Sequence, residues 1–161
     1  MGVNLVQKAD GSAALVSDQG SVDQHRVGGP ATETSYRSDI IVKVPLAAVD
    51  TAGGVFAWQA PANTAVIVTR VELDVTTEST GACTIDVGTT ATSAVTSSDN
   101  LIDGISVATA AGLYSNLKNA GTNGKADQKL AAAKWVTGSV ATGASAGIVG
   151  FAYIHYIPVG V

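Results

Sequence analysis

The stretch SSDNLIDG, residues 97–104, contains the residue types that bind calcium. A calcium loop takes oxygen ligands at its first, third and fifth positions, glycine at the sixth and a bidentate glutamate at the twelfth. With Asp99 placed first, Asp103 and Gly104 fall fifth and sixth, but Leu101 falls third and the twelfth position is an alanine. Two essential ligands are missing, so we expect no metal here.

Turn formation explains the same residues better. Asp99 with Asn100, and Asp103 with Gly104, are pairs whose short polar side chains and permissive glycine favour turns. We therefore predict two turns in this loop. We also predict that three apolar residues anchor the loop in the core: Leu101, Ile102 and Ile105.

Histidine chemistry has little support, because the chain contains only His25 and His155. A hydrolytic nucleophile needs a general base and a carboxylate that orients it. Asp86 or Glu72 can lie near His155 in the fold, but no nucleophile motif accompanies them. In the run YIHY, His155 shares a strand face with the residues two positions before and after it. We predict a packing or interface residue.

Paired carboxylates and tryptophans offer two more candidate sites. Glu72 and Asp74 can in principle act as acid and base, but they alternate with apolar residues and so belong on the solvent face of a strand. Trp58 and Trp135 are either sugar-stacking platforms or core anchors, and their strand-forming neighbours favour the core.

Cys83 lies in an alternating run with no flanking cation, which predicts a buried, unreactive thiol.

The clearest element is the run AVIVTRVELDVTT, residues 65–77, in which apolar and polar residues alternate. This period of two predicts a half-buried strand. The expected core-facing residues are Ile67, Thr69, Val71, Leu73 and Val75. The loop TESTG and the alternating run ACTIDVG follow, and we predict that the two runs form a hairpin.

Other strands follow from similar patterns. Residues 40–46, IIVKVPL, are β-branched and contain Pro45, which suits an edge strand or a strand end. Residues 134–141 and 148–159 are joined by the glycine-containing turn TGASAG, which predicts a second hairpin. The long stretch 89–130 contains LIDGISV and GLYSNL, which are either short strands or, for GLYSNLKNA, a helical turn.

Composition narrows the class of protein. Hydrophobic residues make up 46% of the 161 residues and charged residues only 14%, and the net charge is −4, so a phosphate-binding, nucleic-acid surface is not expected. No stretch is long and apolar enough to span a membrane. Roughly seven or eight strands without an amphipathic helix predict an all-β fold, an antiparallel β-sandwich or jelly roll.

The N-terminal region differs from the rest. Residues 1–38 are polar and have no sustained period, so we expect an extended arm, followed by a sandwich domain over residues 39–161. The start MGVNLVQKAD lacks the features of a secretory signal, so we expect a protein made and kept in a cytoplasm.

Three stretches together carry a family resemblance: VTRVELDVTTESTGACTIDVGTT, SSDNLIDG, and NAGTNGKADQKLAAAKWVTGSVATGASAGIVGFAYIHYIPV. They resemble the small β-sandwich head proteins with which tailed bacteriophages decorate or cement their capsids. The likeness covers the chain from about Ala65 onward. The residues before Asp39 match no pattern of that family.

The resemblance implies a structural virion protein, made in the bacterial cytoplasm, that binds the outer surface of a capsid as a homotrimer and clamps major capsid protein subunits together. It implies no enzymatic activity and no cofactor. Within the arm, polar and aromatic residues are candidates for the capsid contact: Gln24, His25, Arg26, Tyr36 and Arg37. The alternative is a receptor- or glycan-binding module of a tail fibre or head appendage, with Trp58 and Trp135 as its platform.

Overall fold

The computed structural model describes residues 3–7, 13–17, 39–49, 54–93 and 98–159. The chain divides into two compact units, Met1–Tyr36 and Arg37–Val161. In the first unit, β1 (Val3–Gln7) pairs antiparallel with β2 (Ala13–Ser17). This strand pair lies in the stretch for which we expected an extended arm without regular elements.

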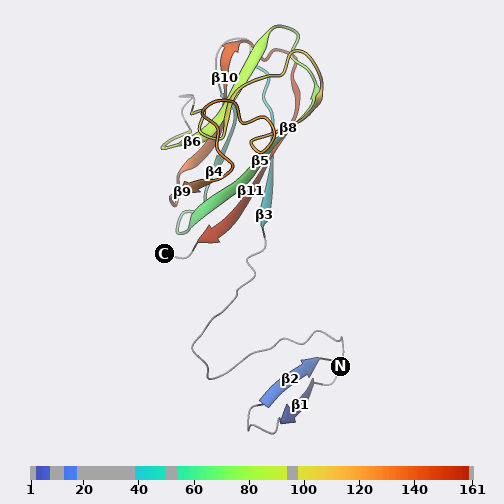
Figure 1. Cartoon of the computed structure of the whole chain (residues 1–161), viewed down its shortest axis with the longest axis vertical. Helices are drawn as coiled ribbons and strands as arrows, with labels where there is room; N and C mark the ends of the chain where they lie inside the picture. The colour runs from blue at the N-terminus through green and yellow to red at the C-terminus, as the bar shows by residue number, and fades with distance from the viewer. Residues whose placement is uncertain (1–2, 8–12, 18–38, 50–53, 94–97, 160–161) are drawn as a thin grey trace. The chain divides into compact units, whose positions relative to one another are not determined.

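The second unit is all-β, and its described residues contain no helix (Figure 1). Its strands in chain order are β3 (Ile40–Pro45), β4 (Gly54–Gln59), β5 (Ala65–Thr77), β6 (Cys83–Thr90), β7 (Ile102–Ser106), β8 (Gly112–Ser115), β9 (Gln128–Leu130), β10 (Trp135–Gly143) and β11 (Val149–Val159). The described part of the chain therefore contains no helix that could span a membrane.

Two antiparallel sheets pack against each other, which confirms the predicted β-sandwich. One sheet has the strand order β4-β10-β6-β7 and the other β3-β11-β5-β8, with β9 also paired to β5. The core lies between the sheets, where fully buried residues such as Leu73 and Ile154 of the five-stranded sheet share one cluster with Ile85 and Val136 of the other.

The strand β5 has the bounds that its alternation predicted, but its buried face is only partly as expected. The second half agrees with the prediction, whereas in the first half Val66 and Val68 are buried in place of Ile67 and Thr69. The register with β11 shifts after His155, where Thr69 is the additional residue on β5. Such a bulge moves the alternation by one position, and a simple period of two does not reveal it.

Both predicted hairpins are wrong. The strands β5 and β6 lie in different sheets, as do β10 and β11, so each connection crosses from one sheet to the other. The two crossing loops contact each other, because Thr80 N donates to Ala146 O at 2.9 Å. Alternation of apolar and polar residues identifies a strand with one buried face, but it does not show which strand is its neighbour. Two such strands in sequence can therefore be joined by a hairpin turn or by a loop that crosses to the other sheet.

The prediction of an edge strand at residues 40–46 is confirmed, because among the described strands β3 pairs with β11 alone and lies at the edge of its sheet. LIDGISV and GLYSNL contain the strands β7 and β8, and a turn over residues 116–118 follows β8.

Candidate functional site

The outward surface of the five-stranded sheet gathers more aromatic and charged side chains than the other candidates considered below. We call this surface the outer face. Alternation and strand register place on it Ile41 and Lys43 of β3, Phe151, Tyr153 and His155 of β11, Arg70, Glu72 and Asp74 of β5, and Leu113 and Ser115 of β8. The partly buried Val42 and Val44 point the other way and pack on the core.

Three polar side chains converge on the outer face beside the Thr69 bulge. Glu72 Oε2 lies 3.2 Å from Arg70 Nη2 and 3.2 Å from His155 Nε2. The same imidazole nitrogen is 3.4 Å from Arg70 Nη2. Arg70 lies opposite His155 and Glu72 opposite Tyr153 in one unbroken register that ends at the bulge, so the three side chains are on the same face of the sheet. The histidine is buried, with 7% of its surface exposed, although it lies on the outward side of the sheet.

This cluster does not have the order of a hydrolytic triad. In a triad the histidine lies between the nucleophile and the carboxylate. Here Ser115 is the cross-strand neighbour of Glu72, so the carboxylate lies between the serine and His155. Asp86, the other carboxylate considered, lies on β6 in the opposite sheet. The geometry instead holds His155 as a packed residue within an ion cluster.

Two aromatic rings and a lysine form the middle of the outer face. Lys43 Nζ lies 3.6 Å from the ring centroid of Phe151 and 5.6 Å from that of Tyr153. Such cation–π contacts contribute about 0.5–1 kcal/mol at exposed sites. At the margins, Ile41 and Leu113 are 56% and 58% exposed. A single exposed apolar side chain is ordinary, but here the two lie on the same sheet face as the rings of Phe151 and Tyr153, and apolar groups gathered on one face are typical of contact surfaces.

Most residues of the outer face were not predicted as a site, although the sequence contains a signal for them. Lys43 alternates with Val42 and Val44, and Phe151 and Tyr153 alternate with small or aliphatic residues. That alternation places the three side chains on one side of their strands, but only the pairing of β3 with β11 brings them together.

The candidate calcium loop forms an acidic corner at one edge of the other sheet. Asp103 and Gly104 lie within β7 and not in the predicted turn. The two residues form a β-bulge, in which both lie opposite the single residue Asp86 of β6. Gly104 has a φ of 70°, and its backbone N donates a hydrogen bond to Asp86 Oδ1 at 2.8 Å. Asn123 joins the loop, because its Nδ2 donates to Asp99 Oδ2 at 2.8 Å and its backbone N to Asp103 Oδ2 at 3.1 Å.

The pKa of Asp86 in this corner is raised, because the carboxyl is partly buried and lies near two other carboxylates. Burial raises the pKa of the Asp86 carboxyl, the hydrogen bond from Gly104 lowers it, and the nearby charges of Asp103 and Asp99 raise it further. Among the described residues, no three His, Cys, Asp or Glu side chains are placed to hold a metal ion. As predicted, Leu101, Ile102 and Ile105 are buried.

Asparagine side chains tie the long loop to the sandwich. Asn100 Oδ1 accepts from Thr89 N at 2.9 Å, which replaces the local turn that we predicted at Asp99 and Asn100. Asn116, only 1% exposed, accepts from Val71 N at 2.8 Å and donates to the carbonyls of residues 125 and 126. This role of Asn116 could not be predicted, because its hydrogen bond with Val71 joins residues 45 positions apart in the chain.

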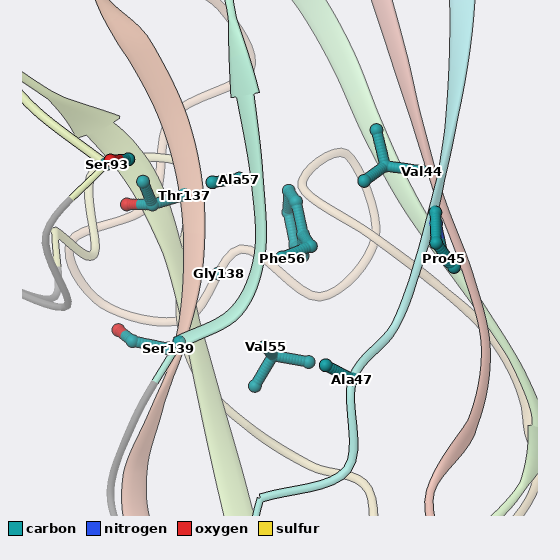
Figure 2. A pocket seen from close by; sticks show the side chains of 11 residues that line it. Val44, Pro45, Ala47, Val55, Phe56, Ala57, Ser93, Thr137, Gly138 and Ser139 are labelled. Atoms are coloured by element: carbon teal, nitrogen blue, oxygen red, sulfur yellow. The ribbon is translucent and has the colours of Figure 1, made fainter.

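A cavity of about 370 Å³ lies beside β4 (Figure 2). Val44, Val55 and Phe56 contribute to its apolar lining. The buried hydroxyls of Thr137 and Ser139, which also line it, have no hydrogen-bond partner in the described part of the chain. None of the described lining residues is charged, so the cavity offers no acid, base or metal ligand.

The two tryptophans do not form a shared platform. Trp58 packs on the core, with its ring centroid 4.9 Å from that of Tyr156, as predicted for a core anchor. Trp58 lies opposite Val136, so Trp135, the preceding residue on β10, points to the other face of the sheet. Cys83 is buried and unpaired, as predicted, and burial raises the pKa of its thiol.

The arm residues predicted to contact a capsid lie outside the described residues. They are Gln24, His25, Arg26, Tyr36 and Arg37.

Comparisons of this chain with known protein families, with curated proteins and with solved structures found no match.

Proposed function

We propose that this protein is a structural virion protein of a tailed bacteriophage, which binds the outer surface of the capsid and stabilises contacts between major capsid protein subunits. It acts by binding and not by catalysis. The observation that carries the proposal is the division of the chain into a β-sandwich and a separate N-terminal unit. A rigid body joined to a second contact element can bridge neighbouring subunits, and many weak contacts repeated by symmetry then add up.

The outer face also supports a binding role. It exposes Ile41 and Leu113 beside two aromatic rings, while the charge cluster of Arg70, Glu72 and His155 lacks the order that a hydrolase needs. The family resemblance of residues 65–161 points in the same direction. The N-terminal arm, with its polar and aromatic residues, is the proposed capsid contact.

Co-sedimentation with expanded, undecorated capsids tests the proposal. We expect saturable binding of the full chain and a higher temperature of shell rupture in the complex. A variant that begins at Asp39 is expected to stay folded and to lose binding. Undiminished binding by this variant would remove the arm from the proposal. Absence of binding by the folded full chain would overturn the cement function and favour the fibre module, which glycan arrays would then test.

A further inference from the structure

We infer that the outer face is a self-association surface, on which a second copy of this chain packs sheet against sheet with β11 at the centre. The inference stands apart from capsid binding, because it rests only on the pattern of side chains on this face.

The two outward surfaces of the sandwich differ in character. On the outward side of the four-stranded sheet, Thr84 and Asp86 of β6 are polar and partly exposed, Thr137 and Ser139 of β10 are buried, and the single aromatic residue of β10, Trp135, lies at the end of the strand. The outer face instead places Phe151 and Tyr153 in its middle, with exposed Ile41 and Leu113 on either side. Aromatic residues are enriched at the centre of protein–protein contacts, with polar residues around them.

The two strands that flank β11 carry opposite net charge, because β3 has one cation, Lys43, whereas β5 has two carboxylates and one cation, Arg70, which is paired with Glu72. Lys43 lies on β3, to one side of β11, and Glu72 and Asp74 lie on β5, to the other side. Lys43 and Glu72 are both cross-strand neighbours of Tyr153, so they occupy the same row across the sheet. Within the described residues, neither Lys43 nor Asp74 forms an ion pair.

This arrangement is self-complementary about one particular axis. A twofold axis parallel to β11 exchanges the two sides of the sheet, so Lys43 of one copy lies over Glu72 and Asp74 of the other, and the reverse contact forms equally. The aromatic rings of the two copies then meet at the centre. A twofold axis perpendicular to the strands would place Lys43 against Lys43, which like-charge repulsion disfavours.

The area of the outer face indicates how strongly two copies are expected to associate. Four strands about 4.8 Å apart, over seven residues of β11 at about 3.4 Å each, cover roughly 400 Å². A stable interface buries about 800 Å² on each partner. We therefore expect a weak dimer, with a dissociation constant in the micromolar range or above, which strengthens when copies are concentrated on a surface.

Substitutions that reverse the charges on the two sides of the contact test the inference. Sedimentation equilibrium of the full chain from about 10 μM to 1 mM should show a monomer–dimer equilibrium. Lys43→Glu and Asp74→Lys should each weaken the dimer at least about tenfold, because each change creates two repulsive pairs. An equimolar mixture of the two variants should restore association in part, since the pair between positions 43 and 74 then joins opposite charges in both contacts, while Glu72 is unchanged. Lys134→Glu, an exposed charge reversal outside the outer face, serves as the matched control.

Restored association in the mixture cannot come from a folding defect, so this result would establish the contact. A wild type that remains monomeric at 1 mM would overturn the inference. The outer face would then either be exposed to solvent or bind a molecule other than a second copy of this chain. It would equally be overturned by association that Lys43→Glu leaves unchanged, including a trimer held through another surface. Capsid co-sedimentation of the same variants is a separate readout, so failure of the contact and failure of the proposed function remain distinguishable.

Discussion

At the scale of single residues, the sandwich places most of its polar groups in roles that hold the fold together. Asn116 is the clearest case, because one buried amide makes three hydrogen bonds that join β5 to the loop before β9. Each such bond contributes about 1 kcal/mol, and a buried partner left without one costs about 1–3 kcal/mol. The long loop is therefore fixed by specific polar contacts as well as by its apolar anchors.

Asp86 gives a prediction about pH. Burial raises its pKa above the ordinary 3.8, so just above pH 3.8 the folded protein retains a proton that the unfolded chain has released. The stability that this group contributes therefore falls as pH rises through its folded pKa. Asp86→Asn keeps an oxygen acceptor for Gly104 N and removes the charge. We expect the variant to be more stable than wild type at pH 7, with a smaller difference at pH 4, in urea unfolding.

The exposed Asp127→Asn, measured in the same way, is the control for a general change in net charge. If Asp86→Asn were no more stable than wild type at pH 7, the cost of burying this carboxylate would be refuted.

At the scale of elements, the bounds of strands were easier to predict than their partners. Residues 65–77 and the edge strand at residues 40–45 follow from local alternation and from Pro45. The pairing of β5 with β11 does not, because the same alternation fits any antiparallel neighbour. The candidate site could not be predicted for the same reason, since Lys43, Tyr153 and Glu72 become neighbours only when β11 pairs with β3 and β5.

The crossing loops give the prediction at this scale. Gly143 ends β10 with φ 77°, and a Cβ at this position would meet the carbonyl of Ala82. We expect Gly143→Ala to lower the free energy of unfolding by about 1–3 kcal/mol, because both the backbone conformation and the space exclude a side chain. Gly81, in the loop after β5, has open space around it and serves as the control. Equal effects of the two substitutions in urea unfolding would contradict this explanation.

At the scale of the whole molecule, the division into two units implies that the sandwich holds its own core. Every described residue of the core cluster lies in Arg37–Val161. We expect a chain beginning at Asp39 to have a thermal midpoint within about 2 °C of the full chain, because it keeps every described residue of the core cluster. Differential scanning calorimetry of both chains measures this. A fall of more than about 5 °C would show that the N-terminal unit stabilises the sandwich.

The position of β11 between β3 and β5 also affects how the chain is made. Glu72 and His155, paired in the finished sheet, are 83 positions apart in the sequence. At a synthesis rate of about 5–20 residues per second, β5 waits roughly 4 to 17 s for its central neighbour. During that interval β5 can pair with β8 and β9 along one edge, but its other edge has no partner until β11 is made. Folding of the sandwich is therefore limited by the arrival of its last strand, and the nascent chain passes through a period in which it is open to aggregation.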